Sequence, residues 1–169
     1  MILLKTSHGD IKIKLDYETT PETAKNFEQY VRDGFYDGLI FHRVISNFMI
    51  QGGGFEPGMK PRKTRESIRN EADKGLSNMQ GTVAMARTMD PHSATSQFFI
   101  NVENNGFLDH TAQNAEGWGY CAFGKVVDSM DTVNTIRSVP TGMRDGHQDV
   151  PAEDVVIISA EVIEDGEPA

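Results

Sequence analysis

Cysteine, long apolar runs and excess positive charge are all scarce in this sequence of 169 residues. The one cysteine, Cys121, cannot form a disulfide within the chain, which excludes a disulfide-stapled secreted scaffold. Residues 1–20 carry lysines and contain no uninterrupted apolar segment of the kind that a signal peptide or a membrane span needs. We therefore expect a cytoplasmic protein that does not bind membranes.

The net charge is −9 with histidine neutral, and the isoelectric point is about 4.9. A field of this sign repels nucleic-acid phosphates and anionic lipids, so we expect no nucleic-acid partner. A local basic run comprises Lys60, Arg62, Lys63 and Arg65. Turn-forming residues surround it and no stacking aromatics interleave it, so a solvated loop surface is favoured over a polyanion site.

Hydrophobic periodicity predicts a chain of short strands with two helices. Residues 10–15 alternate apolar and charged side chains, as a strand with one buried face does. By the same pattern and by β-branched or aromatic content, strands are predicted at 1–6, 10–15, 39–44, 48–51, 81–87, 97–102, 120–126 and 155–163, with a shorter one near 67–69. One helix should start at Pro21, capped by Thr20, and end at Gly34. A second should lie between Asp128 and Val139.

This element order favours an antiparallel barrel or a sandwich, with the helices covering open ends. The chain shows no internal repeat and no linker, so residues 1–169 are expected to form a single domain.

Two segments place polar side chains among large apolar ones. Strand alternation puts Phe41 and Arg43 on one face, and Met49 and Gln51 on one face of the next strand. In the segment Ser96–Asn101, Gln97 and Phe99 share one face, while Phe98 and Ile100 share the other. One of these two faces is expected to enter the core, and the other can line a groove.

Other apparent motifs carry no chemistry. The glycines of residues 52–54 lack the Lys-Ser/Thr ending of a phosphate loop and favour backbone flexibility beside the groove. The five histidines show no metal-ligand spacing, and Cys121 has no second cysteine or paired base. Neither a metal nor another cofactor is expected.

Five segments together resemble the cyclophilins, in the same order along the chain. They are Phe41-His42-Arg43-Val44 through Phe48-Met49-Ile50-Gln51-Gly52-Gly53, then Gly81-Thr82-Val83-Ala84-Met85-Ala86, Ser96-Gln97-Phe98-Phe99-Ile100, Phe107-Leu108-Asp109 and Phe123-Gly124-Lys125-Val126. The resemblance spans nearly the whole chain, and five ordered matches are far more specific than a lone motif. The segments Gly117–Cys121 and His147–Pro151 resemble the bacterial cytoplasmic branch in particular.

The resemblance implies an all-β dominated fold, a closed eight-stranded antiparallel β-barrel capped by two α-helices. It implies a cofactor-free peptidyl-prolyl cis-trans isomerase acting on X-Pro amide bonds in peptides and in unfolded or flexible protein segments. The sequence shows no evident exposed apolar stripe, so we expect a monomer. The catalytic arginine falls on Arg43, and Gln51 either orients it or binds a substrate carbonyl. The substrate-binding positions fall on Phe48, Met49, Ala86, Arg87, Gln97, Phe99, Phe107, Leu108 and Tyr120.

Two positions depart from the commonest eukaryotic pattern, which has tryptophan at Phe107 and histidine at Tyr120. A phenyl ring cannot donate the indole N–H hydrogen bond, so weak cyclosporin binding is expected. A second hypothesis is a proline-peptide-binding or chaperone-like module with incidental catalysis. The presence of Arg43 favours the enzyme, because a binding module could lose that residue without losing its apolar pocket.

Overall fold

Strand β2 (Gly9–Leu15) shows how the sequence pattern builds the core. Ile11, Ile13 and Leu15 are buried on one face, and Lys14 on the other face is exposed. A tight turn before β2 joins it to β1 (Ile2–Thr6) as an antiparallel hairpin, in which Thr6 faces Gly9. Gly9 has φ +124°, a conformation that side-chain-bearing residues rarely adopt.

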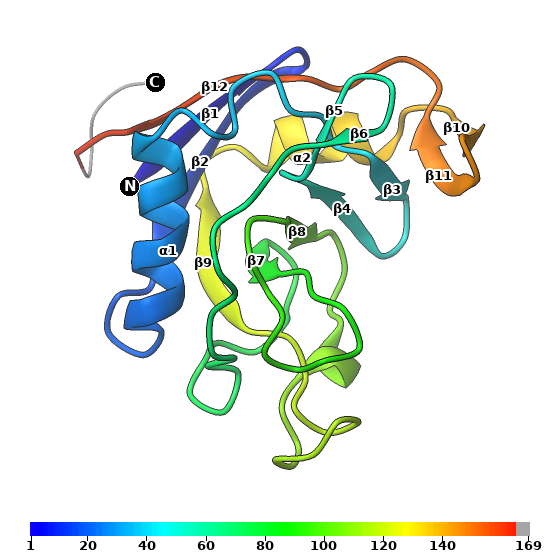
Figure 1. Ribbon diagram of the computed structural model, residues 1–169. Coiled ribbons are helices and arrows are strands. Elements are labelled where there is room, and N and C mark those ends of the chain that lie inside the picture. The colour runs from blue at the N-terminus through cyan, green and yellow to red at the C-terminus, as the bar shows by residue number, and fades with distance from the viewer. Residues whose placement is uncertain (165–169) are drawn as a thin grey trace.

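The computed structural model describes residues 1–164, and its main feature is one curled antiparallel sheet of eight strands (Figure 1). The strand order is β12-β1-β2-β9-β7-β8-β4-β3. Its remaining strands are β3 (Arg43–Ile45), β4 (Met49–Gly52), β7 (Thr82–Met85), β8 (Phe98–Asn101), β9 (Ala122–Val127) and β12 (Ile157–Val162). Two hairpins stand apart, β5 (Phe55–Glu56) with β6 (Lys60–Pro61), and β10 (Thr141–Arg144) with β11 (His147–Pro151).

The prediction of an all-β dominated fold with two helices is confirmed, and so is the existence of the eight principal strands. The strand predicted near residues 67–69 is absent from the described chain, and the hairpin β10–β11 was not predicted. The edge strands β12 and β3 form no ladder with one another over residues 1–164, so the sheet is curled but not closed as a barrel by its strands. A two-sheet sandwich is excluded by the single eight-stranded sheet.

Helix α1 (Pro21–Arg32) packs against β12 and β9, and α2 (Met130–Arg137) packs against β2, β3 and β4. Thr20 is the N-cap residue of α1 and Pro21 occupies its first turn, both as predicted, but the Thr20 side chain makes no capping hydrogen bond. Thr20 donates its hydroxyl hydrogen to the carbonyl of Asp16 instead. The buried carboxylate of Glu71, from a distant loop, accepts hydrogen bonds of 2.6 Å from both the backbone N–H and the hydroxyl of Thr23.

The two faces of the sheet bury different clusters. The main core lies under α1, where the Phe27 ring contacts Tyr36, Phe98 and Phe123 at centroid distances of 5.1, 5.3 and 5.2 Å. A smaller cluster on the other face is formed by Met49, Ala84, Phe99 and Ala122. This second cluster forms the apolar floor of the candidate site.

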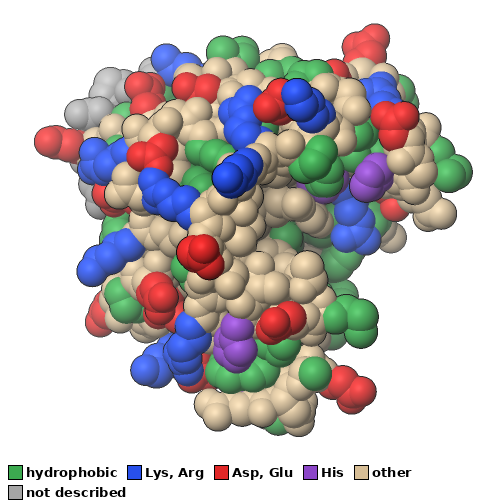
Figure 2. Space-filling model, in the orientation of Figure 1, with side chains coloured by type: hydrophobic (Ala, Val, Ile, Leu, Met, Phe, Trp, Pro, Cys, Tyr) green, Lys and Arg blue, Asp and Glu red, His purple; other side chains and the backbone are tan. Residues whose placement is uncertain are grey.

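Basic and acidic side chains are interspersed over the face seen in Figure 2. The predicted basic run is part of this pattern, because Arg62 pairs with Glu56 at 3.0 Å and Arg65 pairs with Asp33. These ion pairs support the solvated-surface interpretation of the run. Within residues 1–164, neither helix is long and apolar enough to cross a membrane.

Candidate active site

The strand register places the central residues of the site in one row across the sheet. Arg43 on β3 lies opposite Gln51 on β4, and Gln51 lies opposite Phe99 on β8. Phe99 in turn lies opposite Ala84 on β7. Because paired residues project to the same face, a guanidinium, an amide and a phenyl ring stand side by side on the face away from the main core.

The predicted split of faces on β8 is confirmed, since Phe98 and Ile100 enter the main core while Phe99 lies on the opposite face. The predicted shared face of Phe41 and Arg43 is wrong. Phe41 is fully buried in the core, whereas Arg43 is exposed. Strand β3 begins only at Arg43, so strand alternation does not extend back to Phe41.

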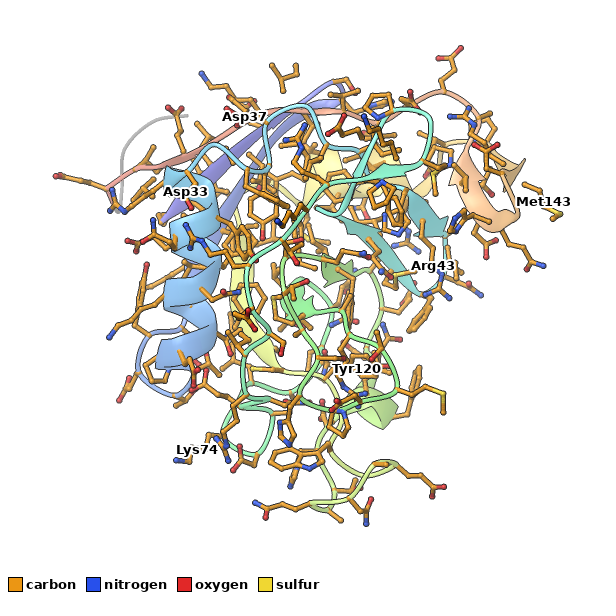
Figure 3. All side chains as sticks on the ribbon, viewed as in Figure 1. Asp33, Asp37, Arg43, Lys74, Tyr120 and Met143 are labelled. Atoms are coloured by element: carbon orange, nitrogen blue, oxygen red, sulfur yellow. The ribbon has the colours of Figure 1, made fainter. Side chains whose placement is uncertain are left out.

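This row borders a cavity of about 270 Å³. All nine residues that line the cavity were among the predicted site residues, namely Arg43, Phe48, Met49, Gln51, Ala86, Arg87, Phe99, Leu108 and Tyr120. Figure 3 shows Arg43 beside β3, with Tyr120 below it in this view. The cavity therefore combines an apolar floor with two guanidinium groups and one amide.

A chain of side-chain contacts runs from Arg43 into the neighbouring strands. Arg43 Nη1 lies 3.5 Å from the Gln51 amide oxygen, which can accept its hydrogen bond. The Gln51 amide nitrogen donates to the amide oxygen of Gln97 at 3.0 Å. Gln97 does not line this cavity, but its bond to the Gln51 amide nitrogen fixes the orientation of that amide. The Gln51 amide oxygen therefore points to Arg43 as a hydrogen-bond acceptor.

The glycines that follow Gln51 are close-packed, so their interpretation as flexible backbone is wrong. Gly52, Gly53 and Gly54 are buried. A methyl group on Gly54 would lie 2.5 Å from the Cγ atom of Gln97. A methyl group on Gly52 would lie 2.7 Å from the backbone carbonyl oxygen of Ile40, so this glycine is needed for close approach of the two backbone segments.

Phe48 forms one wall of the cavity and is held through its backbone. Asn105 donates its side-chain N–H to the Phe48 carbonyl at 2.9 Å. Phe107 stacks on Phe48, with ring centroids 5.9 Å apart. The structure does not bring Phe107 into the cavity itself, because its side chain is 76% exposed and reaches the site only through Phe48.

Leu108 and Tyr120 form another wall of the cavity, and a backbone hydrogen bond joins them. The Tyr120 N–H donates to the Leu108 carbonyl at 2.8 Å. Asp109 anchors the turn η1 (Gly106–Leu108), because its carboxylate accepts hydrogen bonds from Ser77 and from the backbone N–H of Asn78. Burial alone would raise the pKa of Asp109, but these hydrogen bonds outweigh it and the pKa is lowered.

Arg87 links this wall to the next loop. Its Nε and Nη2 donate to the Gly119 carbonyl at 3.1 and 3.0 Å, and its Nη1 donates to the Thr88 carbonyl at 2.9 Å. The guanidinium carbon lies 4.5 Å from the centre of the Tyr120 ring. Arg87 is thus held in one orientation at the rim of the cavity.

A second cavity of about 150 Å³ shares Gln51, Ala86 and Arg87 with the first. Its other lining residues are Thr88, Ser93, Thr95 and Gln97, of which only Gln97 was predicted. Short polar residues in a loop give no periodic signal, so sequence reasoning missed the three hydroxyl residues.

The buried thiol of Cys121 and the buried imidazole of His42 are both uncharged. Burial raises the pKa of the Cys121 thiol to about 12, so the thiol stays protonated at neutral pH. Burial also lowers the pKa of His42 to about 4, with smaller contributions from His147 and Arg43, so this imidazole is neutral. Among residues 1–164, no three His, Cys, Asp or Glu side chains lie close enough together to hold a metal ion. The arrangement is suited to binding an apolar ring and to placing a permanent positive charge beside it.

Comparison with known proteins agrees with the cyclophilin resemblance of the sequence. The family model described as cyclophilin type peptidyl-prolyl cis-trans isomerase/CLD matches residues 1–162. The chain is 58% identical over 164 residues to peptidyl-prolyl cis-trans isomerase B of Escherichia coli, covering 97% of this chain and 100% of that protein. It is 57% identical over 160 residues to peptidyl-prolyl cis-trans isomerase cyp18 of Streptomyces antibioticus, covering 95% of this chain and 96% of that protein.

Solved structures agree with the sequence relatives. A Cryptosporidium parvum cyclophilin type isomerase, crystallised in the presence of the dipeptide Ala-Pro, superimposes with a TM-score of 0.82 at 26% identity. The match covers 97% of this chain and 99% of that one. The chain therefore belongs to the cyclophilin-type peptidyl-prolyl cis-trans isomerases.

Proposed function

We propose that this isomerase binds the proline ring of an X-Pro segment in the cavity above Met49 and Phe99, and stabilises the twisted amide with Arg43. The observation that carries the proposal is the guanidinium of Arg43 at the rim of an apolar cavity, beside the Gln51 amide. An arginine is permanently charged and needs no proton transfer.

The chemistry of the amide bond explains why this arrangement is sufficient. Rotation faces a barrier of about 18–20 kcal/mol, because the nitrogen lone pair is delocalised into the carbonyl. Twisting the bond localises that lone pair on nitrogen, where a donor can reach it. A hydrogen bond made only to the twisted state lowers the barrier without stabilising the ground state.

One charged hydrogen bond does not account for the whole rate. An acceleration of about five orders of magnitude requires about 7 kcal/mol, whereas one such bond contributes about 1.5–3 kcal/mol. Orientation of the proline ring by Phe48, Met49, Phe99 and Leu108 must supply the remainder. Exclusion of water by the same side chains strengthens the contact with Arg43.

The test is Arg43→Ala, measured for rate and for affinity on the same proline peptide. We expect kcat/KM, from NMR exchange, to fall by about 100-fold, a loss of about 2.7 kcal/mol of transition-state stabilisation. The peptide Kd, from an NMR titration, should rise by less than about fivefold, because the apolar floor remains. Arg32→Ala is the matched control, since Arg32 lies on α1 and outside the cavity. Equal losses of rate and affinity would favour the alternative of a binding module with incidental catalysis.

The substrates in this proposal are proline-containing peptides and unfolded or flexible protein segments. The Cryptosporidium parvum isomerase, crystallised in the presence of Ala-Pro, supports that class. We also propose a single domain over residues 1–169, of which 165–169 lie outside the described residues, and a cytoplasmic monomer. The family match over residues 1–162 supports the single domain. The exposed large apolar side chains are scattered over separate loops and strands, which supports the monomer.

Weak binding of cyclosporin is part of the same proposal. The Phe107 side chain has no hydrogen-bond donor, and its ring already stacks on Phe48. We expect isothermal titration of the purified protein to give weak binding, and Phe107→Trp, which adds an indole N–H, to bind more tightly. Tight binding by the unaltered chain would contradict this expectation.

We further propose that the curled sheet closes into a barrel through the segment before β3. Backbone hydrogen bonds support this closure: Phe41 N–H donates to the Val155 carbonyl at 2.9 Å, and Ile157 N–H donates to the Leu39 carbonyl at 2.7 Å. An isolated antiparallel bridge joins Ile40 to Val156 between them.

A further inference from the structure

The arginines of this chain differ in whether a carboxylate lies close enough to form an ion pair. The sequence contains Arg32, Arg43, Arg62, Arg65, Arg69, Arg87, Arg137 and Arg144. Six of them form ion pairs with a carboxylate, namely Arg32 with Glu28, Arg62 with Glu56, Arg65 with Asp33, Arg69 with Asp73, Arg137 with Glu103 and Arg144 with Asp154. Within residues 1–164, Arg43 and Arg87 have no such partner.

Both unpaired arginines lie in the same groove, formed by the two cavities that share Gln51, Ala86 and Arg87. Among the described residues, neither cavity is lined by an aspartate or a glutamate. The whole chain nevertheless carries a net charge of −9. The groove is therefore a local positive region on an acidic protein, where a negatively charged ligand is favoured.

Arg87 is pre-organised for a further contact. Its hydrogen bonds to the carbonyls of Gly119 and Thr88 use three of the five guanidinium N–H groups. Carbonyl groups do not neutralise the positive charge, and the stack on Tyr120 holds the guanidinium plane in place. Binding of a substrate carboxylate to Arg87 therefore restricts the side chains of the enzyme little further.

The smaller cavity next to Arg87 suits a short polar side chain. Thr88, Ser93 and Thr95 line it, and the Thr88 hydroxyl donates to the Ser93 hydroxyl at 2.7 Å. It adjoins the cavity to which we assign the proline ring, since Gln51, Ala86 and Arg87 line both. An extended chain advances about 3.3 Å per residue, so neighbours within about three residues of the proline can reach it.

We propose that this isomerase prefers X-Pro segments that carry an aspartate or glutamate within about three residues of the proline, and that Arg87 is the residue that sets this preference. The inference rests on the proposed function, because it assumes that the proline occupies the larger cavity. Arg43 contributes to the same field, but it is assigned to the amide nitrogen.

The test compares two series of peptides, each with a single proline in an alanine background. One series carries Glu, and the other carries Gln, at each position within about three residues on either side of the proline. The ratio of kcat/KM for Glu over Gln at each position cancels any general change in activity. We expect a ratio of about three to ten at one or more positions, the range for a partly exposed charged contact. In about 1 M sodium chloride, where the Debye length is about 3 Å, the ratio should fall towards one.

Variants locate the preference in Arg87. Arg87→Gln should bring the Glu/Gln ratio to about one, and Arg87→Lys should retain part of it, because the charge remains without the planar fork. Arg32→Gln is the matched control, since it removes the same charge from α1 and should leave the ratio unchanged. Circular dichroism and thermal unfolding establish that each variant is folded.

Two results would overturn the inference. One is a ratio near one at every position in the unaltered enzyme, a result that needs no variant. The other is a ratio that persists in folded Arg87→Gln. The Gln series separately tests the proposed function: a failure of that function would leave all Gln peptides unaccelerated, whereas a failure of this inference would leave them accelerated without preference.

Discussion

His42 precedes the proposed catalytic arginine and carries a neutral imidazole in an apolar setting. Its ring packs against Phe55 at 4.6 Å, and its Nδ1 atom has no hydrogen-bond partner within residues 1–164. Burial, followed by the neighbouring His147 and Arg43, lowers its pKa from 6.5 to about 4. Protonation of His42 therefore requires either an uncompensated buried charge or opening of the structure around it.

This shift predicts a pH-dependent stability. Between pH 6.5 and about 4 the unfolded chain binds a proton at His42 that the folded chain does not, so the free energy of unfolding falls as the pH falls through that window. The loss attributable to His42 should reach about 3 kcal/mol at the acid end. Urea unfolding at a series of pH values measures it, and His42→Phe should remove this component. An NMR titration that places the folded-state pKa of His42 near 6.5 would contradict the prediction.

At the same scale, individual site residues were predictable because packing alone rarely places polar side chains among large apolar ones. Arg43 and Gln51 stood out as polar side chains among large apolar ones, and both line the cavity. Phe107 was predicted as a member of the site, yet it is separated from the cavity by Phe48. Its position depends on how η1 lies against the turn before β4, which no local pattern specifies.

At the scale of the element, Gly54 after β4 affects the site through the side chain of Gln97, which lies just before β8. Gly54 leaves space for the Gln97 side chain, which in turn holds the Gln51 amide. A methyl group at Gly54 would lie within 2.5–2.7 Å of three Gln97 atoms. The flexible Gln97 side chain can move away, so we expect little change in stability but a loss of its bond to Gln51.

Gly54→Ala should therefore lower kcat/KM by about three- to tenfold, the value of one hydrogen bond to the site, with a small change in Tm. A peptide isomerisation assay and thermal unfolding measure the two effects. Gly142→Ala is the matched control, because no atom lies within 4 Å of the methyl group that it adds. In a Gln97→Ala background the Gly54 substitution should cost much less, since the clash is then gone. Equal costs in both backgrounds would show that Gly54 acts by another route.

The strands were predictable as elements because each carries a period of two or a β-branched and aromatic run. Their ends were less predictable: β8 was predicted at 97–102 and spans Phe98–Asn101. Thr20 is the N-cap residue as predicted, and the absence of its side-chain capping bond has a tertiary cause. The Glu71 carboxylate, from far along the chain, accepts the hydrogen bonds of Thr23 instead.

At the scale of the whole molecule, closure of the sheet depends on a few backbone contacts. If the segment before β3 closes the barrel against residues 155–157, the amide hydrogens of Phe41 and Ile157 are shielded from solvent. Hydrogen–deuterium exchange followed by NMR should find these amides exchanging at least about 100-fold more slowly than that of Met89, which is 92% exposed. Comparable exchange rates at the three amides would show that the sheet is open at this edge.

By itself the sequence determined the fold class, the family and most of the lining of the site. Alternation and residue type are local properties of the chain, and ordered motifs accumulate over its length. Only the tertiary structure decided which side chains face one another. It placed Arg43, Gln51 and Phe99 in one row, and tied Arg87 to Gly119 and Tyr120. Among residues 1–164, it left two arginines of one groove without a carboxylate partner. Pairing across strands and loops joins residues distant in the chain, and no local pattern records which of them will meet.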